Sequence, residues 1–298
     1  MDAVPILFYE EVIDKLHTTG PLRCCKLDGW FGVLSSRAYE NYVHRHIIIN
    51  GGQIKKEVLL SAYGHRDTVE PNHQQKVRRL TSISICAGPN ECKLDQDVID
   101  RVLTATNGNF VQLYMFTSNN MLHLIESVQK LYLLQLWCID EHSLKNVEVV
   151  VRKKTLIFLH LLHFDEPYDT RFTPVLMELF KQDQFQTLSV TYNCVSLVEE
   201  LIGYWFQNTE KMRGKYIRCQ ETAQCLRSSN FGFRKCTDAE HRDRCSRVPI
   251  GQELVGDWSR SHVESYILRN DTGAAMYWMF SAGNKKLGIF DDSLVLFD

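Results

Sequence analysis

Cysteine and histidine side chains that could bind a metal ion gather in one stretch near the end of the chain. They are Cys219, Cys225, Cys236, His241 and Cys245. Structural zinc sites usually take their ligands from pairs spaced about two to four residues apart. The gaps in this stretch are far wider, and the sequence contains no C-x-x-C motif. We therefore expect a partly buried, cysteine-containing connector and no metal site.

Other patterns that could carry chemistry are equally sparse. His160 and His163 are three residues apart, which in a strand places their side chains on opposite faces, so we expect no shared ion. The sequence has no G-x-S-x-G nucleophile motif and no glycine-rich phosphate-binding loop. The basic runs at 77–79 and 152–155 are not interleaved with aromatic residues that could stack on bases. We therefore expect no enzyme, no cofactor and no nucleic-acid partner.

The composition is that of a globular protein. Of the 298 residues, 44% are hydrophobic and 23% are charged, and the formal net charge is −2. This balance gives no overall attraction to nucleic acid or acidic membranes. The first residues lack a basic leader, and no apolar run is long enough to span a membrane. We expect a soluble intracellular protein, cytoplasmic or nuclear, with reduced cysteines.

An apolar pattern, L-x-x-L-x-L, recurs through the middle of the chain. Its copies begin at residues 80, 110, 131, 156 and 185, so the steps are 30, 21, 25 and 29 residues. This spacing is close to the range of about 20–29 residues that is typical of leucine-rich repeats. Only in the last copy does an asparagine, Asn193, complete the longer motif. The pattern therefore predicts an irregular repeat array.

The segments between the copies have helical periodicity. Apolar residues at 98, 99, 102 and 103 form one helical stripe, and those at 175, 176, 179 and 180 form another. Alternating strands and helices at this spacing predict an α/β fold with parallel strands and crossover helices on one side. A closed, doubly wound α/β domain would give the same alternation. Because no glycine-rich loop follows any strand, we favour the leucine-rich-repeat-like array.

The same alternation predicts which strand residues point away from the helices. They lie between the inward apolar positions and are Ser82, Ser84, Gln112, Tyr114, Gln135, Trp137, His160, Ser189 and Thr191. Tyrosine and tryptophan often dominate the binding energy of protein interfaces. We therefore predict an exposed partner-binding face that includes Tyr114, Gln135, Trp137, His160 and Thr191.

The two ends of the chain differ from the middle. Short helices with a Gly-Pro break are expected in residues 1–40, and the repeat-like strand-helix domain would cover 41–218. Residues 219–298 would hold the connector and a β-hairpin with its turn at 270–273. Such a hairpin would cap the open end of a repeat array.

Apolar residues near the N-terminus resemble the pattern of an F-box. The pair Val4-Pro5 is followed by the pair Val12-Ile13, then by Leu16, Leu22, Cys25, Leu27 and Trp30. Val4 stands where most F-boxes have leucine. The segments "MDAVPILFYEEVI", "YVHRHIIINGGQI" and "YWFQNTEKMRGKYI" also resemble divergent nematode F-box-like proteins, so the resemblance is spread over the chain.

The resemblance implies a non-enzymatic adaptor. The N-terminal helices would bind the Skp-type adaptor of a cullin-based SCF ubiquitin ligase, and the repeat-like domain would bind an unknown protein substrate. The docking surface would consist of Val4, Pro5, Phe8, Val12, Ile13, Leu16 and Leu27. The alternative is a repeat-type protein-binding module with a degenerate, non-functional F-box and no role in a ligase.

Overall fold

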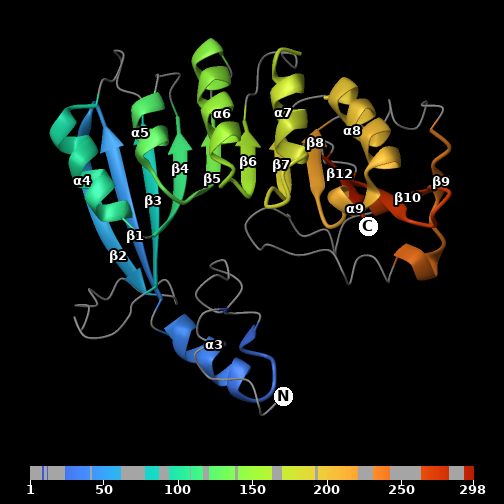
Figure 1. Cartoon of the computed structure of the whole chain (residues 1–298), viewed down its shortest axis with the longest axis horizontal. Helices are drawn as coiled ribbons and strands as arrows, with labels where there is room; N and C mark the ends of the chain where they lie inside the picture. Colours follow the sequence, from blue (N-terminus) through green and yellow to red (C-terminus); the bar gives the residue numbers. More distant parts are fainter. Residues whose placement is uncertain are drawn as a thin grey trace, which may run out of the picture. The chain divides into compact units, whose positions relative to one another are not determined.

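The structure is a computed structural model of the whole chain (Figure 1). It describes residues 9, 12, 24–40, 42–61, 78–86, 94–107, 109–116, 121–137, 140–162, 170–191, 194–220, 231–241, 263–281 and 292–298. Among these residues, no helix combines the length and the apolar character needed to cross a membrane. All statements below concern the described residues.

The described strands form a mixed sheet of twelve, in the order β2-β1-β3-β4-β5-β6-β7-β8-β12-β11-β10-β9. Most of the strands from β3 to β8 are joined through helices, and every pair whose register is resolved there is parallel. The C-terminal strands are antiparallel. The predicted α/β class and its strand-helix alternation are therefore confirmed. The chain divides into two compact units, residues 1–116 with 127–131, and residues 117–126 with 132–298.

Unit 1 begins with helix α3 (Trp30–Glu40), which leads into strands β1 (Tyr42–Asn50) and β2 (Gln53–Ser61). Gly51 and Gly52, both with positive φ, join these two strands in a tight hairpin, because a two-residue turn of this kind favours residues without a Cβ. Strand β1 also pairs in parallel with β3 (Arg78–Cys86), which pairs with β4 (Phe110–Met115).

Helix α4 (Gln96–Thr106) connects β3 to β4. The hydroxyl of Thr81 in β3 donates to the carbonyl oxygen of Ala105 in α4 at 3.2 Å, so α4 covers the face of β3 that also carries Ile83 and Ile85. We call this the helix face, and the opposite one, with Ser82 and Ser84, the far face.

Unit 2 contains the regular part of the alternation. Its strands are β5 (Leu131–Leu136, from Tyr132 onward), β6 (Phe158–Leu161), β7 (Thr187–Val190) and β8 (Tyr216–Gln220). Its helices are α5 (Leu122–Ser127), α6 (Glu141–Lys153), α7 (Phe172–Phe180), α8 (Val195–Gln207) and α9 (Thr209–Met212). Figure 1 shows α6, α7 and α8 side by side along the same side of these strands.

The helix face of unit 2 is the core. Leu134, Leu159, Leu188 and Ile217, which lie next to one another across β5–β8, are fully buried. Lys215 is also buried on this side, and its ammonium donates to the carbonyl oxygens of Phe180 and Gln182, both at 2.6 Å. Burial lowers the pKa of Lys215 to about 8, so the group is still charged at pH 7. A cation is favoured there because the carbonyl end of α7 carries negative partial charge.

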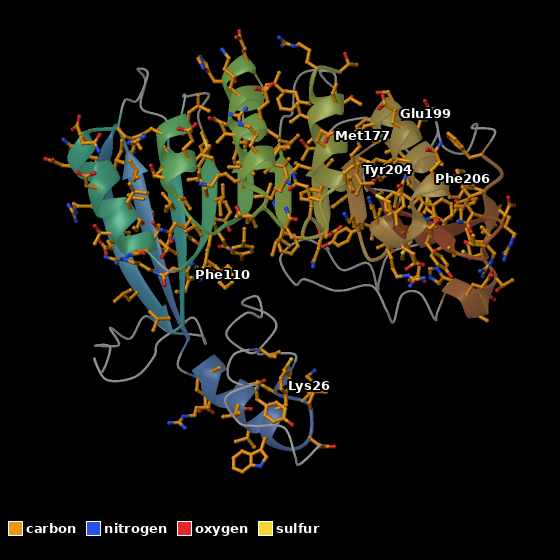
Figure 2. All side chains as sticks on the ribbon, in the orientation of Figure 1. Lys26, Phe110, Met177, Glu199, Tyr204 and Phe206 are labelled. Carbon is orange, nitrogen blue, oxygen red and sulfur yellow. The ribbon has the colours of Figure 1, made fainter. Side chains whose placement is uncertain are left out.

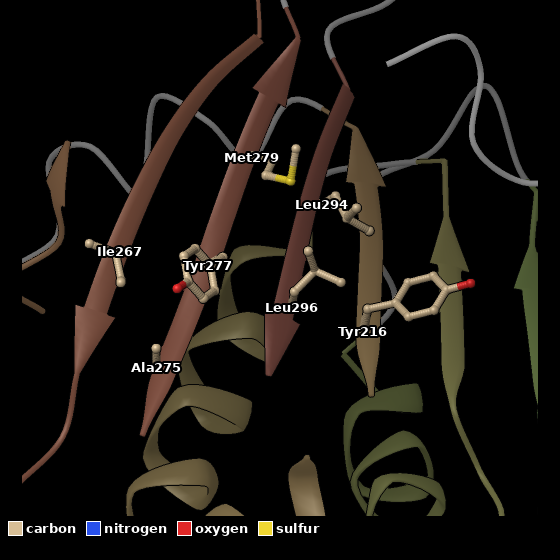
Figure 3. Packing of buried hydrophobic residues seen from close by; sticks show 7 residues of the cluster. All are labelled: Tyr216, Ile267, Ala275, Tyr277, Met279, Leu294 and Leu296. Carbon is tan, nitrogen blue, oxygen red and sulfur yellow. The ribbon is translucent and has the colours of Figure 1, made fainter. Parts of the chain in front are cut away.

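The predicted C-terminal hairpin is present as β10 (Val263–Arg269) and β11 (Ala275–Ser281). It does not join the parallel strands directly, because β12 (Asp292–Phe297) lies between β8 and β11 and pairs with both. Strand β9 (Arg234–Lys235) pairs with the outer side of β10. Figure 3 shows the buried apolar cluster on one face of these strands, formed by Tyr216, Ile267, Ala275, Tyr277, Met279, Leu294 and Leu296.

The five apolar patterns expected from the sequence all coincide with strands, β3 to β7. Two further strands join the parallel series, β1 and β8. Strand β8 also crosses the boundary predicted at residues 218 and 219, so the segment after it continues the same sheet.

Candidate binding face

In unit 1, polar side chains line the far face where β1, β3 and β4 lie side by side. The parallel register aligns His46 with Ser82 and Ser84 with Tyr114, and it pairs Ser82 with Gln112. Because side chains alternate along a strand, these residues all point away from α4. Three neighbouring strands thus bring together hydroxyl, imidazole and amide groups that are up to 70 residues apart in the sequence, from His44 to Tyr114.

Most of these groups form one hydrogen-bonded network, and His46 and Ser84 form a separate contact. The Nε2 of His44 lies 2.7 Å from the hydroxyl of Ser82, which donates to Oε1 of Gln112 at 2.6 Å. The hydroxyl of Tyr114 donates to the same oxygen at 3.0 Å. The Nε2 of His46 lies 3.1 Å from the hydroxyl of Ser84. Ser82 and Gln112 are buried, so the network replaces water contacts that these groups lose on folding.

In this arrangement His44 acts as a hydrogen-bond donor to Ser82. Ser82 has one hydroxyl proton, and it points at Gln112 Oε1, which can only accept. The Nε2 of His44 must therefore donate to Ser82 and cannot take its proton. Burial lowers the pKa of His44 to about 4, with a smaller contribution from the neighbouring His46, so the imidazole is neutral at pH 7. The pKa of His46 is also lowered, first by burial and then by Lys56.

In unit 2, the register aligns a second polar row across the far face. Gln135, His160, Ser189 and Arg218 are direct neighbours on β5, β6, β7 and β8. The Nδ1 of His160 lies 3.3 Å from Oε1 of Gln135 and therefore donates to it. Burial, with a smaller contribution from the positive charge of Arg218, lowers the pKa of His160 to about 4. Within the described residues, Nε2 of His160 is buried and has no hydrogen-bond partner.

The five residues predicted to bind a partner are divided between the two units. Tyr114 lies on the far face of unit 1 and is half-buried. Gln135, His160, Trp137 and Thr191 belong to unit 2; the first two lie on the far face of β5 and β6, and the others directly follow β5 and β7. Gln135, Trp137 and Thr191 are half-buried, whereas His160 is only 6% exposed.

The predicted exposure of this face is therefore wrong for part of it. Ser82, Gln112, His160 and Ser189 lie on the predicted side of the sheet but are buried. In unit 1, Ser82 is covered by the side chains of His44 and Gln112, with which it forms hydrogen bonds. Phe110 (Figure 2) adds an aromatic ring to the far face of unit 1. The ammonium of Lys130 lies 5.5 Å from the centroid of this ring.

No family model, curated protein or solved structure matches this chain. The functional argument therefore rests on the geometry and on the sequence pattern.

The predicted docking segment is described in part. Val4, Pro5, Phe8, Ile13 and Leu16 lie outside the described residues, and Val12 is helical and half-buried. Leu27 is exposed, at 53% of its surface. Two further large apolar residues nearby are also exposed, Trp30 at 58% and Val33 at 59%.

The residues weighed as metal ligands are spread over unit 2. Cys219 is buried in β8 beside Cys194, and the two thiols interact, which together with burial raises the pKa of Cys194. The ring of His241 lies elsewhere, with Nδ1 2.7 Å from the hydroxyl of Ser265. Cys225, Cys245 and His163 lie outside the described residues. In the part of the chain that the structure describes, no three cysteine, histidine or acidic side chains form a group that could hold a metal ion.

Sequence reasoning missed His44 and His46. Both belong to β1, which the L-x-x-L-x-L pattern does not include, because a histidine occupies the leading position of "HRHIII". The available signal was the alternation of His44, His46 and Ile48 with Val43, Ile47 and Ile49, which is typical of a strand with one buried face.

Proposed function

We propose that this chain is a protein-interaction adaptor. Its N-terminal segment would dock on the Skp-type adaptor of a cullin-based ubiquitin ligase, and the far faces of its parallel strands would bind a protein substrate. The observation that carries this proposal is the exposed apolar surface formed by Leu27, Trp30 and Val33. These are the most exposed large apolar side chains in the described part of the chain, and they lie within seven residues of one another. Clustered apolar exposure of this kind is typical of a site for another protein.

Local geometry holds this surface outward. Gly29, with positive φ, ends the turn that precedes α3, and Trp30 and Val33 then follow on one side of the helix. On the other side, a Cβ added to Gly32 would overlap the carbonyl oxygen of Leu27. The turn therefore packs against α3 at a position where only glycine fits. Lys26, which is labelled in Figure 2, belongs to the same turn and is exposed.

The substrate-binding half of the proposal is supported by the regular alternation of strands and helices. We assign this part of the chain to an irregular leucine-rich-repeat-like architecture, in which a row of parallel strands presents one face to a partner. The half-buried Tyr114 and Trp137 would supply aromatic contact area, and the polar rows would supply hydrogen bonds.

The docking half can be tested by co-expressing the full chain with the Skp adaptor of the same organism and measuring co-elution in size-exclusion chromatography. The double variant Leu27→Glu and Val33→Glu should abolish co-elution, because two charges would be buried in the contact. Phe206→Glu is the matched control, since Phe206 is an exposed apolar residue of α8 at 44% (Figure 2).

Each outcome has a definite meaning. Co-elution of the wild type and of Phe206→Glu, but not of the double variant, would support docking through this surface. A wild-type chain that folds and ignores the adaptor would refute the ligase role. The alternative, a protein-binding module without a ligase, would then be the better description of the chain.

A further inference from the structure

Strand β2 lies at one end of the described sheet. It is the last strand in the order, and it pairs on one side only, with β1. No described strand is longer than its nine residues. Among the described residues, none forms a hydrogen bond with the backbone on its open side. A strand edge of this length presents a row of backbone donors and acceptors with which another strand can pair.

The hairpin geometry determines which backbone groups of β2 point outward. A two-residue turn is closed by a hydrogen-bonded pair, here at Gln53, and hydrogen-bonded and open pairs then alternate along β1. Ile47 and Arg45 of β1 belong to open pairs, so their partners on β2 do not bond to β1. These partners are Glu57 and Leu59. Their backbone N–H and C=O groups therefore point away from the sheet.

The side chains next to these groups are open to solvent. Lys55, Lys56 and Glu57 are exposed, and Val58 and Leu59 are half-buried. Because successive residues of a strand point to opposite faces, exposure of both Lys56 and Glu57 leaves both faces of the sheet accessible beside the edge. An incoming strand can therefore reach the outward backbone groups.

The charges of the edge indicate which strand it accepts. Lys55 lies opposite no residue of β1, and a bulge and lysines on an edge strand oppose pairing with a like edge. Full-length antiparallel pairing of β2 with a second copy would place Glu57 opposite itself, and the next register toward the turn would place Lys56 opposite itself. Like charges directly opposite each other are destabilising. Glu57 is, moreover, already paired with Arg45. The edge therefore favours a strand of a different protein, with acidic residues beside the two lysines.

We propose that β2 accepts an extended segment of a partner protein as an additional strand of the sheet, with acidic residues of the segment beside Lys55 and Lys56. The outward backbone groups of Glu57 and Leu59 form the new hydrogen bonds. In such strand addition the main-chain bonds supply affinity, and the side chains along the edge supply specificity. The site lies on a different surface from the one that would dock the Skp-type adaptor.

The first experiment uses the unmodified full chain. Amide hydrogen exchange followed by NMR should be fast at Glu57 and Leu59 and slow at Val58, whose N–H points toward β1. Slow exchange at Glu57 and Leu59 in the free chain would mean that this chain or a second copy already covers the edge. That result would overturn the proposal without any variant being needed.

The second experiment adds a probe, acetyl-Thr-Val-Glu-Val-Glu-Val-Thr-amide. In one control peptide lysines replace the glutamates, and in another prolines replace the valines. The glutamate peptide should bind and slow exchange at Glu57 and Leu59. The lysine peptide should bind more weakly, and the proline peptide, which lacks N–H groups for a strand, should not bind. Equal binding of the three peptides, or binding that leaves both amides unprotected, would contradict strand addition.

A pair of variants isolates one backbone donor. Glu57→Pro removes an outward N–H, and proline is tolerated on an edge strand where the N–H faces solvent. It should weaken binding of the glutamate peptide about tenfold. Glu57→Ala is the matched control, because it also loses the ion pair with Arg45 but keeps the N–H, and its affinity should stay within about twofold of the wild type. Equal affinities of the two variants would exclude pairing at this edge. Co-elution with the Skp-type adaptor does not involve β2, so either proposal can fail while the other stands.

Discussion

The far faces of the two units carry similar residues in different hydrogen-bonding states. In unit 1, His44, Ser82, Gln112 and Tyr114 form a chain in which each hydrogen bond joins a donor to an acceptor. In unit 2, the row around His160 ends at a buried nitrogen without a partner among the described residues. Both histidines have a pKa lowered to about 4, mainly by burial. The two networks therefore share the burial of their histidines and differ in how completely the buried polar atoms are paired within the described residues.

The difference arises from the neighbouring strands. In unit 1, β3 supplies a serine hydroxyl within reach of each histidine of β1. In unit 2, Gln135 forms a hydrogen bond with one nitrogen of His160. On the other side of His160, the neighbour on β7 is Ser189, and the neighbour of Ser189 on β8 is Arg218. We accordingly expect the polar groups of unit 1 to contribute more to stability than those of the row around His160.

The largest expected effect is the loss of stability in acid, which both units share. An unfolded histidine takes up a proton near pH 6.5, but folded His44 and His160 do so only near pH 4. Their stabilisation is therefore complete above pH 6.5 and is lost as the pH falls toward 4, by up to about 3 kcal/mol for each residue. Urea denaturation of the wild type, His44→Gln and His160→Gln across this range measures it. If each variant keeps the full wild-type pH slope, the histidines are not buried in the neutral form.

A second prediction separates the two networks. Gln112→Leu removes the acceptor of both Ser82 and Tyr114, and it should destabilise unit 1 by about 2–3 kcal/mol. Gln135→Leu removes one acceptor from the unit 2 row and should cost about half as much. Hydrogen exchange resolved by unit provides the measurement. Equal losses for the two variants would contradict the view that the unit 1 network is the more complete one.

A third variant tests one link in unit 1. Tyr114→Phe deletes a single donor and leaves Gln112 Oε1 paired with Ser82, so we expect a loss of about 1 kcal/mol in the free energy of unfolding. A loss as large as that of Gln112→Leu would mean that the tyrosine ring, rather than its hydroxyl, carries the contribution.

The smallest expected effect is that of Arg218→Met. The side chain is half-buried, and we expect a change within about 0.5 kcal/mol in stability. Thermal unfolding of the variant and the wild type provides the comparison. Marked destabilisation by Arg218→Met would instead indicate a structural role for this arginine.

The repeated strands and the orientation of their side chains were predictable from the sequence. The spacing of Leu80, Phe110 and Leu131 marked three successive strands, and the alternation placed Gln112 and His160 on the far face. Both features depend on local periodicity, which one sequence contains.

Features that depend on distant neighbours were not predictable. Strand β8 was missed because Gly214 occupies the leading position of its pattern and the buried Lys215 follows. The ammonium of Lys215 donates to the carbonyl oxygens of residues 180 and 182, and no local sequence pattern predicts these contacts. The same holds for Nε2 of His160, because whether a distant side chain of the described residues reaches it cannot be seen in the local sequence.

The position of β12 sets the order in which unit 2 can assemble. Residues 216–220 of β8 pair with residues 292–296, whereas the hairpin of β10 and β11 closes over a single short turn. The hairpin can form early, since its loop closure costs little entropy, but it has no place in the sheet until the more distant strand has docked. Attachment of β9, β10 and β11 to the sheet thus depends on the long-range pairing of β12 with β8. We therefore expect a folding intermediate in which the parallel strands are protected from exchange before β10 and β11 are.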